Sequence, residues 1–174
     1  IQSSQMLADI WVKDNGDIPS VLMHNASKGT LNTTVCALPD DELRRIAADA
    51  GVSDEEIETL LAGDSVLPLW RDCYYDPAAD EYYQGFQPDG STLVEPVFAA
   101  GDKLSIQHQR YTGQDEAGND VYRTYTAQLP IAGVVKSANN YTLLTTDRLI
   151  FSGTIFVSTA LYHKMFESAG SYHM

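Results

Sequence analysis

The order of apolar and polar positions along the chain predicts a mixture of strands and short helices. Apolar residues alternate with polar ones, or β-branched residues gather, at 6–13 and 31–37, and both patterns are typical of strands. Strand patterns recur at 65–70, 103–109, 121–128, 131–135 and 149–157. The polar segment between the two patterns at 103–128 predicts the tip of a hairpin.

Two short helices are predicted between these strands. The first begins after Pro39, carries carboxylates in its first turn and ends at Gly51, and its apolar residues recur at helical spacing. The second begins with a capping box formed by Ser53 and Glu56. Because this second helix is acidic, the pair is better interpreted as a helical hairpin packed on a sheet than as a DNA-binding helix-turn-helix. A third helix is predicted at 159–167.

These elements predict an α+β fold, in which a mixed sheet carries inserted short helices. The chain has 174 residues, 44% of them hydrophobic and 20% charged, which is enough apolar material for one folded unit with its own core. We expect a single domain. Within it, two lobes are an alternative: a helical and tyrosine-rich insertion at about 39–95, and a β-rich core formed by 1–38 and 96–174.

Charge narrows the range of partners. The chain has 24 acidic and 11 basic side chains, a formal net charge of −13. This sign argues against binding to nucleic acid or to anionic lipid headgroups, both of which require lysine and arginine. A cationic peptide or small molecule would be attracted, although solubility alone is a sufficient reason for such a charge.

An acidic segment rich in tyrosine is the best candidate for a recognition surface. The sequence pattern predicts a loop here, and its aromatic side chains alternate with carboxylates, a combination suited to cationic or amphipathic ligands. The simpler interpretation, which the pattern favours, is that alternate tyrosines face the core. The candidate ligand-binding residues are Trp70, Tyr74, Tyr75, Tyr82, Tyr83 and Phe86.

The two cysteines, Cys36 and Cys73, leave two interpretations open. They form a disulfide if the compartment is oxidising, or they are separate buried thiols that pack as small apolar residues. They are too few for a zinc site.

No residue pattern indicates catalysis, a metal site or a cofactor. The acidic residues of the two loops are Asp76, Asp80, Glu81, Asp115, Glu116 and Asp120. Neither loop has the ligand spacing of a calcium-binding loop, so solvated turns are the expected interpretation. The chain also lacks a nucleophile elbow and a glycine-rich phosphate loop. We therefore predict no catalytic residue, metal ligand or cofactor.

Four segments near the C-terminal end carry a resemblance to a known family. They are a strand at 101–106, a strand at 129–135, a strand at 154–158 and a helix at 160–166. In this order they resemble the extracytoplasmic domain of FtsX-like (MacB-type) ABC-transporter permeases, over about 98–167 and more loosely at 39–63. The acidic tyrosine segment departs from that family's pattern.

The resemblance implies a non-catalytic domain outside the membrane. It would bind or gate a substrate or partner and couple that event to the spans of the parent permease, while a separate ATP-binding subunit hydrolyses ATP. No apolar stretch approaches the roughly 20 residues needed to cross a bilayer, so the expected chain is a soluble part of a longer, membrane-anchored protein. The alternatives are a free-standing secreted binding or adhesion module and a small secreted hydrolase.

Overall fold

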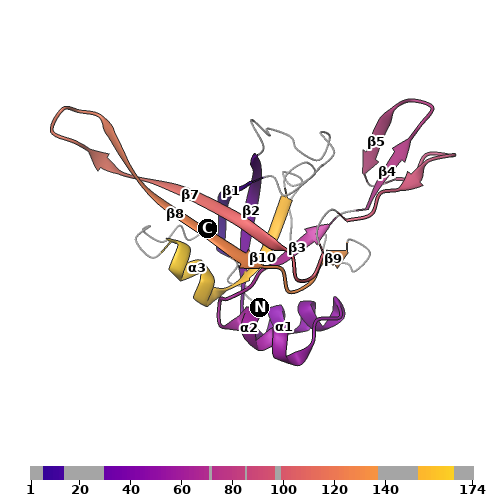
Figure 1. Ribbon diagram of the computed structural model, residues 1–174, viewed down its shortest axis with the longest axis horizontal. Coiled ribbons are helices and arrows are strands. Elements are labelled where there is room, and N and C mark those ends of the chain that lie inside the picture. Colours follow the sequence, from indigo (N-terminus) through magenta and orange to yellow (C-terminus); the bar gives the residue numbers. More distant parts are fainter. Residues whose placement is uncertain are drawn as a thin grey trace.

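The computed structural model describes residues 6–13, 30–70, 72–84, 86–96, 99–136 and 153–166. Their fold is α+β, with helices packed on a mixed sheet (Figure 1). The helices are α1 (Asp40–Asp49), α2 (Asp54–Leu61) and α3 (Thr159–Phe166). The strands are β1 (Met6–Lys13), β2 (Thr30–Leu38), β3 (Leu67–Trp70), β4 (Cys73–Asp76), β5 (Glu81–Gln84), β6 (Thr92–Leu93), β7 (Lys103–Gln114), β8 (Asp120–Pro130), β9 (Val135–Lys136) and β10 (Gly153–Ser158).

A seven-stranded main sheet forms the centre of the molecule, in the order β8-β7-β1-β2-β10-β3-β9. Most neighbours are antiparallel, whereas β10 runs parallel to β2 and β9 runs parallel to β3. Several neighbours, such as β1 and β7 or β2 and β10, come from distant parts of the chain, whereas β7 and β8 form a hairpin. A second sheet contains only β5, β4 and β6, in that order.

The main sheet is covered on both faces. Successive side chains of a strand point to opposite sides of the sheet, so neighbouring residues belong to different apolar clusters. Val35, Ala37, Ile155 and Val157 belong to one apolar cluster, which also contains Leu161 and Met165 of α3. Their neighbours Cys36, Leu38 and Phe156 belong to the other cluster, together with the apolar side chains of α1 and α2. The helical hairpin and α3 thus cover opposite faces of the sheet.

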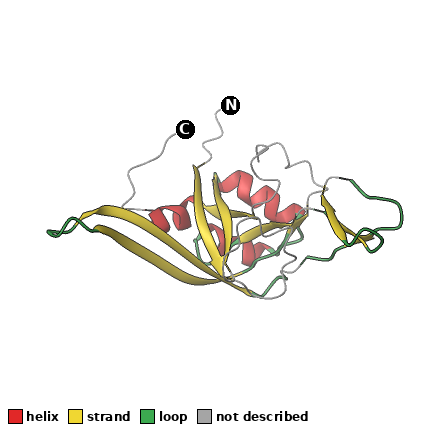
Figure 2. Cartoon of the chain, turned by 90° about the horizontal axis from the view of Figure 1, so that it is seen from above, coloured by secondary structure: helices red, strands yellow, loops and turns green. Residues whose placement is uncertain are grey.

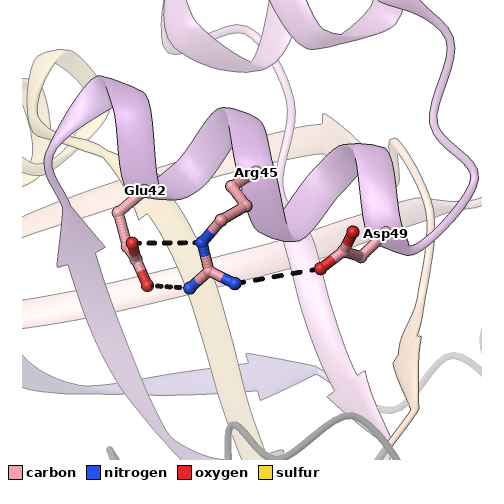
Figure 3. A network of polar contacts seen from close by, with 3 residues as sticks. All are labelled: Glu42, Arg45 and Asp49. Carbon is pink, nitrogen blue, oxygen red and sulfur yellow. Dashed lines mark hydrogen bonds and ion pairs between the residues drawn. The ribbon is translucent and has the colours of Figure 1, made fainter.

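The helical hairpin follows the predicted pattern closely. The hydroxyl of Ser53 accepts a hydrogen bond from the backbone N–H of Glu56, whose carboxylate accepts one from the N–H of Ser53. On the exposed side of α1, Arg45 lies between Glu42 and Asp49 (Figure 3). Such exposed ion pairs stabilise a helix only slightly, so apolar packing against the sheet holds the hairpin in place.

Two parts of the chain project from this core at opposite ends (Figures 1 and 2). One is the β7–β8 hairpin, whose far half exposes both of its faces. There the rings of Tyr111 and Tyr122 meet edge to face at 5.9 Å. The other is the three-stranded sheet of β4, β5 and β6, which we call the tyrosine sheet.

The segment predicted as a tyrosine-rich loop is instead a hairpin, β4–β5, to which β6 adds a third strand. The division into two lobes stays a prediction. Within 39–95, however, α1, α2 and β3 contribute to the core of the main sheet, and only the tyrosine sheet pairs outside it.

The other expected elements are present where the structure describes the chain. The segment at 131–135, predicted as one buried strand, contributes a single bridge at Ile131 and the short β9, while its side chains are largely buried as expected. The predicted strand at 149–157 begins outside the described residues. Among the described helices, none is long and apolar enough to cross a membrane.

Candidate recognition surface

Local turn chemistry builds the hairpin that carries the tyrosines. The carboxylate of Asp76 accepts a hydrogen bond of 2.8 Å from the backbone N–H of Ala78, which closes an Asx-type turn. Asp80 then adopts a left-handed backbone conformation with φ of 53°, which aspartate tolerates better than most residues. The chain reverses over 77–80, and β5 returns in register along β4.

The register of the three strands sorts their side chains onto two faces. Tyr74 is paired with Tyr83 on one side and with Leu93 on the other, so these three side chains lie on the same face. Asp76 and Glu81 are also paired and form the next row of that face. We call this surface the aromatic–acidic face; it consists of Tyr74, Asp76, Glu81, Tyr83 and Leu93, with Phe86 packed against Tyr83.

Contacts within the aromatic–acidic face fix the position of a carboxylate beside an aromatic ring. The hydroxyl of Tyr83 donates a hydrogen bond of 2.8 Å to Oε2 of Glu81. The ring of Tyr83 meets that of Phe86 edge to face, with centroids 5.3 Å apart. Phe86 and Leu93 remain 59% and 51% exposed, so the face presents apolar surface to solvent.

The opposite face of the tyrosine sheet repeats this chemistry with different residues. Tyr75 and Tyr82 are paired across the strands, and their ring centroids lie 4.9 Å apart. The hydroxyl of Tyr75 donates a hydrogen bond of 2.8 Å to Oδ1 of Asp80. This face therefore also joins an aromatic pair to a carboxylate.

Both tyrosine–carboxylate pairs are held with the phenol protonated. The hydrogen bond to Asp80 raises the pKa of Tyr75, and the hydrogen bond to Glu81 raises the pKa of Tyr83, because ionising either phenol would remove the donated proton. In each pair the tyrosine hydroxyl is thus the donor and the carboxylate is the acceptor. The arrangement suits a cationic group, which a carboxylate attracts by charge and a ring attracts through its π face.

The structure brings together five of the six predicted binding residues. Tyr74, Tyr75, Tyr82, Tyr83 and Phe86 belong to the tyrosine sheet or its edge. Trp70 ends β3 in the main sheet and is only 6% exposed, so it does not join that surface. Sequence reasoning did not select Leu93, because only the pairing of β6 with β4 places this residue beside the tyrosines.

The four tyrosines do not follow the simpler interpretation, in which alternate side chains face the core. All four are half-buried, and they divide between the two faces of a separate small sheet. The two core clusters are built from other residues. Both faces of the tyrosine sheet are therefore accessible in part.

Cys36 and Cys73 are separate thiols in the structure, and both are buried. Cys36 lies in β2 on the side of the sheet covered by the helical hairpin, whereas Cys73 begins β4. Burial raises the pKa of Cys36 to about 12 and also raises that of Cys73. Of the two interpretations that the sequence left open, the structure has the separate buried thiols.

The raised pKa of Cys36 predicts a loss of stability in alkali. The folded protein retains the thiol proton that the unfolded chain loses above pH about 9, so the stabilisation is complete below that pH and declines up to about 12. Between these values, the free energy of unfolding of the wild type should fall more steeply than that of Cys36→Ala, by up to about 1.4 kcal/mol per pH unit. Urea unfolding at a series of pH values measures both slopes; parallel slopes would contradict the prediction.

The acidic hairpin tip at 115–120 is a capped turn. The carboxylate of Asp115 accepts hydrogen bonds from the backbone N–H groups of Ala117 and Asn119 and from the side-chain amide of Asn119. These bonds lower the pKa of Asp115, and the bond from the Asn119 side chain has the largest effect. Within the part of the chain that the structure describes, no three histidine, cysteine or carboxylate groups gather in a way that could hold a metal ion.

An open pocket of about 390 Å³ lies where the link between α1 and α2 faces the segment around Glu95 and the start of β9. Its charged lining residues are Glu56, Glu95 and Lys136. The carboxylate of Glu56 accepts hydrogen bonds from the backbone N–H and the hydroxyl of Ser53, so it is engaged in capping α2. The tyrosine sheet therefore stays the stronger candidate for recognition.

No family model, curated protein or solved structure matches the chain.

Proposed function

We propose that this chain is a non-catalytic binding domain on the extracytoplasmic side of an ABC-transporter permease. Through the tyrosine sheet it would bind a substrate or partner, and it would transmit that event through the main sheet to the spans of the parent permease. ATP hydrolysis would take place in a separate ATP-binding subunit. No cofactor is required for this role.

One observation carries the binding function. The tyrosine sheet stands outside both core clusters and projects from one end of the molecule, with aromatic rings and carboxylates fixed beside each other. Aromatic side chains provide large contact areas at a low cost in conformational entropy, which is why they are enriched in recognition surfaces. With Phe86 and Leu93 more than half exposed beside these rings, the sheet is suited to a ligand that covers it.

The membrane context rests on the resemblance of the segments at 101–106, 129–135, 154–158 and 160–166 to the extracytoplasmic domain of FtsX-like permeases. These segments include a strand that begins after Gly101 and another strand that leads directly into a helix. Ser158 joins the last two elements, because its hydroxyl accepts a hydrogen bond from the backbone N–H of Leu161 at the start of α3. A mixed sheet that carries a recognition surface at its end is suited to relay motion to segments attached to it.

Sequencing the reading frame on both sides of this chain tests whether the chain belongs to a membrane protein. We expect apolar spans of about 20 residues on both sides of this chain, one before it and several after it. A cleavable signal peptide without any span would overturn the permease assignment. The same tyrosine sheet would then favour the second candidate, a free-standing secreted binding or adhesion module.

A further inference from the structure

We propose that the tyrosine sheet binds an extended basic peptide, which adds to the free edge of β5 as a fourth strand. The peptide would carry a lysine or arginine two positions away from an apolar residue. This inference rests on the proposed binding function and assigns to it a class of ligand and a mode of recognition. Register, charge and an open strand edge support it.

The first support is the edge position of β5. The order of the tyrosine sheet is β5-β4-β6, so β4 occupies one side of β5. Among the described residues, no strand pairs with the other side. The backbone groups of an edge strand can pair with an extended peptide, a common mode of peptide recognition that derives affinity from main-chain hydrogen bonds.

The second support is the spacing of side chains along that edge. Glu81 and Tyr83 are two residues apart on β5 and point to the same face, the aromatic–acidic face. A peptide strand in register with β5 would place two of its own residues, also two apart, directly opposite this pair. A basic residue opposite Glu81 and an apolar residue opposite Tyr83 would satisfy both positions.

The contacts on the face show why a basic residue suits the position opposite Glu81. The hydrogen bond from the hydroxyl of Tyr83 holds the Glu81 carboxylate beside the tyrosine ring. A lysine or arginine head that pairs with this carboxylate lies beside the hydroxyl end of Tyr83, so the ionic contact has a fixed position and the aliphatic part of the side chain can pack along the ring. Phe86, 59% exposed and packed on Tyr83, extends the apolar contact available to the neighbouring residue.

The third support is charge complementarity. The segment at 72–96 contains the whole tyrosine sheet and has no lysine, arginine or histidine. Its carboxylates are Asp72, Asp76, Asp80, Glu81, Asp89 and Glu95, six in all. A basic peptide is attracted to such a segment at long range, whereas an acidic peptide is repelled. This difference selects a basic peptide among the extended segments that could pair with β5.

Two peptides of identical composition test the mode of binding. In the sequence Thr-Lys-Thr-Val-Thr-Lys-Thr, each lysine lies two positions from valine in either strand direction, so lysine and valine share one face. In Lys-Thr-Thr-Val-Thr-Thr-Lys, the lysines lie three positions away and face the opposite side. With fluorescent labels and blocked ends, both can be titrated with the wild-type chain by fluorescence anisotropy at low ionic strength. We expect the first peptide to bind about tenfold more tightly than the second.

Two matched variants locate the site. Glu81→Gln and Glu116→Gln each remove one negative charge from an exposed position, but only Glu81 belongs to the aromatic–acidic face beside the edge of β5. Glu116 lies at the tip of the β7–β8 hairpin, which projects from the opposite end of the molecule. We expect Glu81→Gln to weaken binding of the first peptide about tenfold and Glu116→Gln to weaken it less than twofold. Circular dichroism of both variants checks that the fold is retained.

Three results would overturn the inference: no binding of the first peptide, equal binding of the two peptides, or an equal loss in the two variants, which would indicate attraction by net charge alone. Each of these leaves the permease assignment in place, because that assignment depends on the spans in the parent reading frame. Conversely, a reading frame without spans leaves the peptide result unchanged. The two proposals therefore fail separately.

Discussion

Phe156→Ala should destabilise the protein by about 3–5 kcal/mol, the largest effect that we expect of a single substitution. Phe156 lies in β10 near the centre of the main sheet, is fully buried, and belongs to the cluster that joins the sheet to the helical hairpin. Removing its ring leaves a cavity that strands fixed on both sides cannot close. For a chain of this size, the melting temperature should fall by roughly 6–20 °C.

Phe86→Ala is the matched control for this substitution. The same atoms are removed, but Phe86 is 59% exposed, lies just after β5 and belongs to neither core cluster. We expect a change of no more than about 0.5–1 kcal/mol. Urea unfolding of both variants gives the comparison. A cost for Phe156→Ala as small as that of Phe86→Ala would contradict the packing of β10 against the helical hairpin.

Gly63→Ala should destabilise the protein by about 2–4 kcal/mol, and two separate effects contribute to this loss. Gly63 follows α2 with φ of +86°, a left-handed conformation that costs L residues about 1–2 kcal/mol. A Cβ at this position would also lie 3.0 Å from the backbone nitrogen of Leu161 at the start of α3. Because a helix backbone cannot move aside as a side chain can, the close approach adds strain to the left-handed conformation.

Gly51→Ala separates the two effects. Gly51 follows α1 with φ of +81°, and a Cβ there would meet nothing within 4 Å. Both glycines occupy the same position of a Schellman motif, since Gly51 donates to the carbonyl of Ala48 and Gly63 to that of Leu60. Gly51→Ala should therefore cost only about 1–2 kcal/mol. Equal losses in thermal unfolding would show that the backbone at Gly63 does not lie against the backbone of Leu161.

The parts of the fold that could be predicted from the sequence are those determined by local chemistry. The capping box of Ser53 and Glu56 and the helix end at Gly51 identified the helical hairpin with nearly correct bounds. The long strands β7 and β8 were evident from their patterns, and so was the turn between them. In each case the signal and the structure that it specifies lie within a few residues of each other.

The features that the sequence did not predict depend on pairing between distant segments. Nothing local indicates that β10 lies between β2 and β3, or that β6 joins β4 and places Leu93 beside Tyr74. The acidic, tyrosine-rich segment was predicted as a loop, although only its centre, around Pro77, is a turn. The residues on either side of that turn form strands, because tyrosine favours the β conformation.

The candidate site was therefore found in part. Aromatic composition identified Tyr74, Tyr75, Tyr82 and Tyr83, yet the division of these residues between two faces follows only from the strand register. The same composition grouped Trp70 with them, whereas the structure places Trp70 in the main sheet, at the end of β3, which its proximity in sequence does not show. Which carboxylate each tyrosine contacts likewise follows only from the strand register.

The central claim is that the tyrosine sheet is the recognition surface of this chain. Amide chemical shifts of the isotopically labelled protein, followed during titration with Thr-Lys-Thr-Val-Thr-Lys-Thr, test it most directly. We expect the largest shifts at β5, with smaller ones at β4 and β6, and little change in the equally exposed, acidic first turns of α1 and α2. Shifts centred on those helices, or spread evenly over the acidic surface, would contradict the claim.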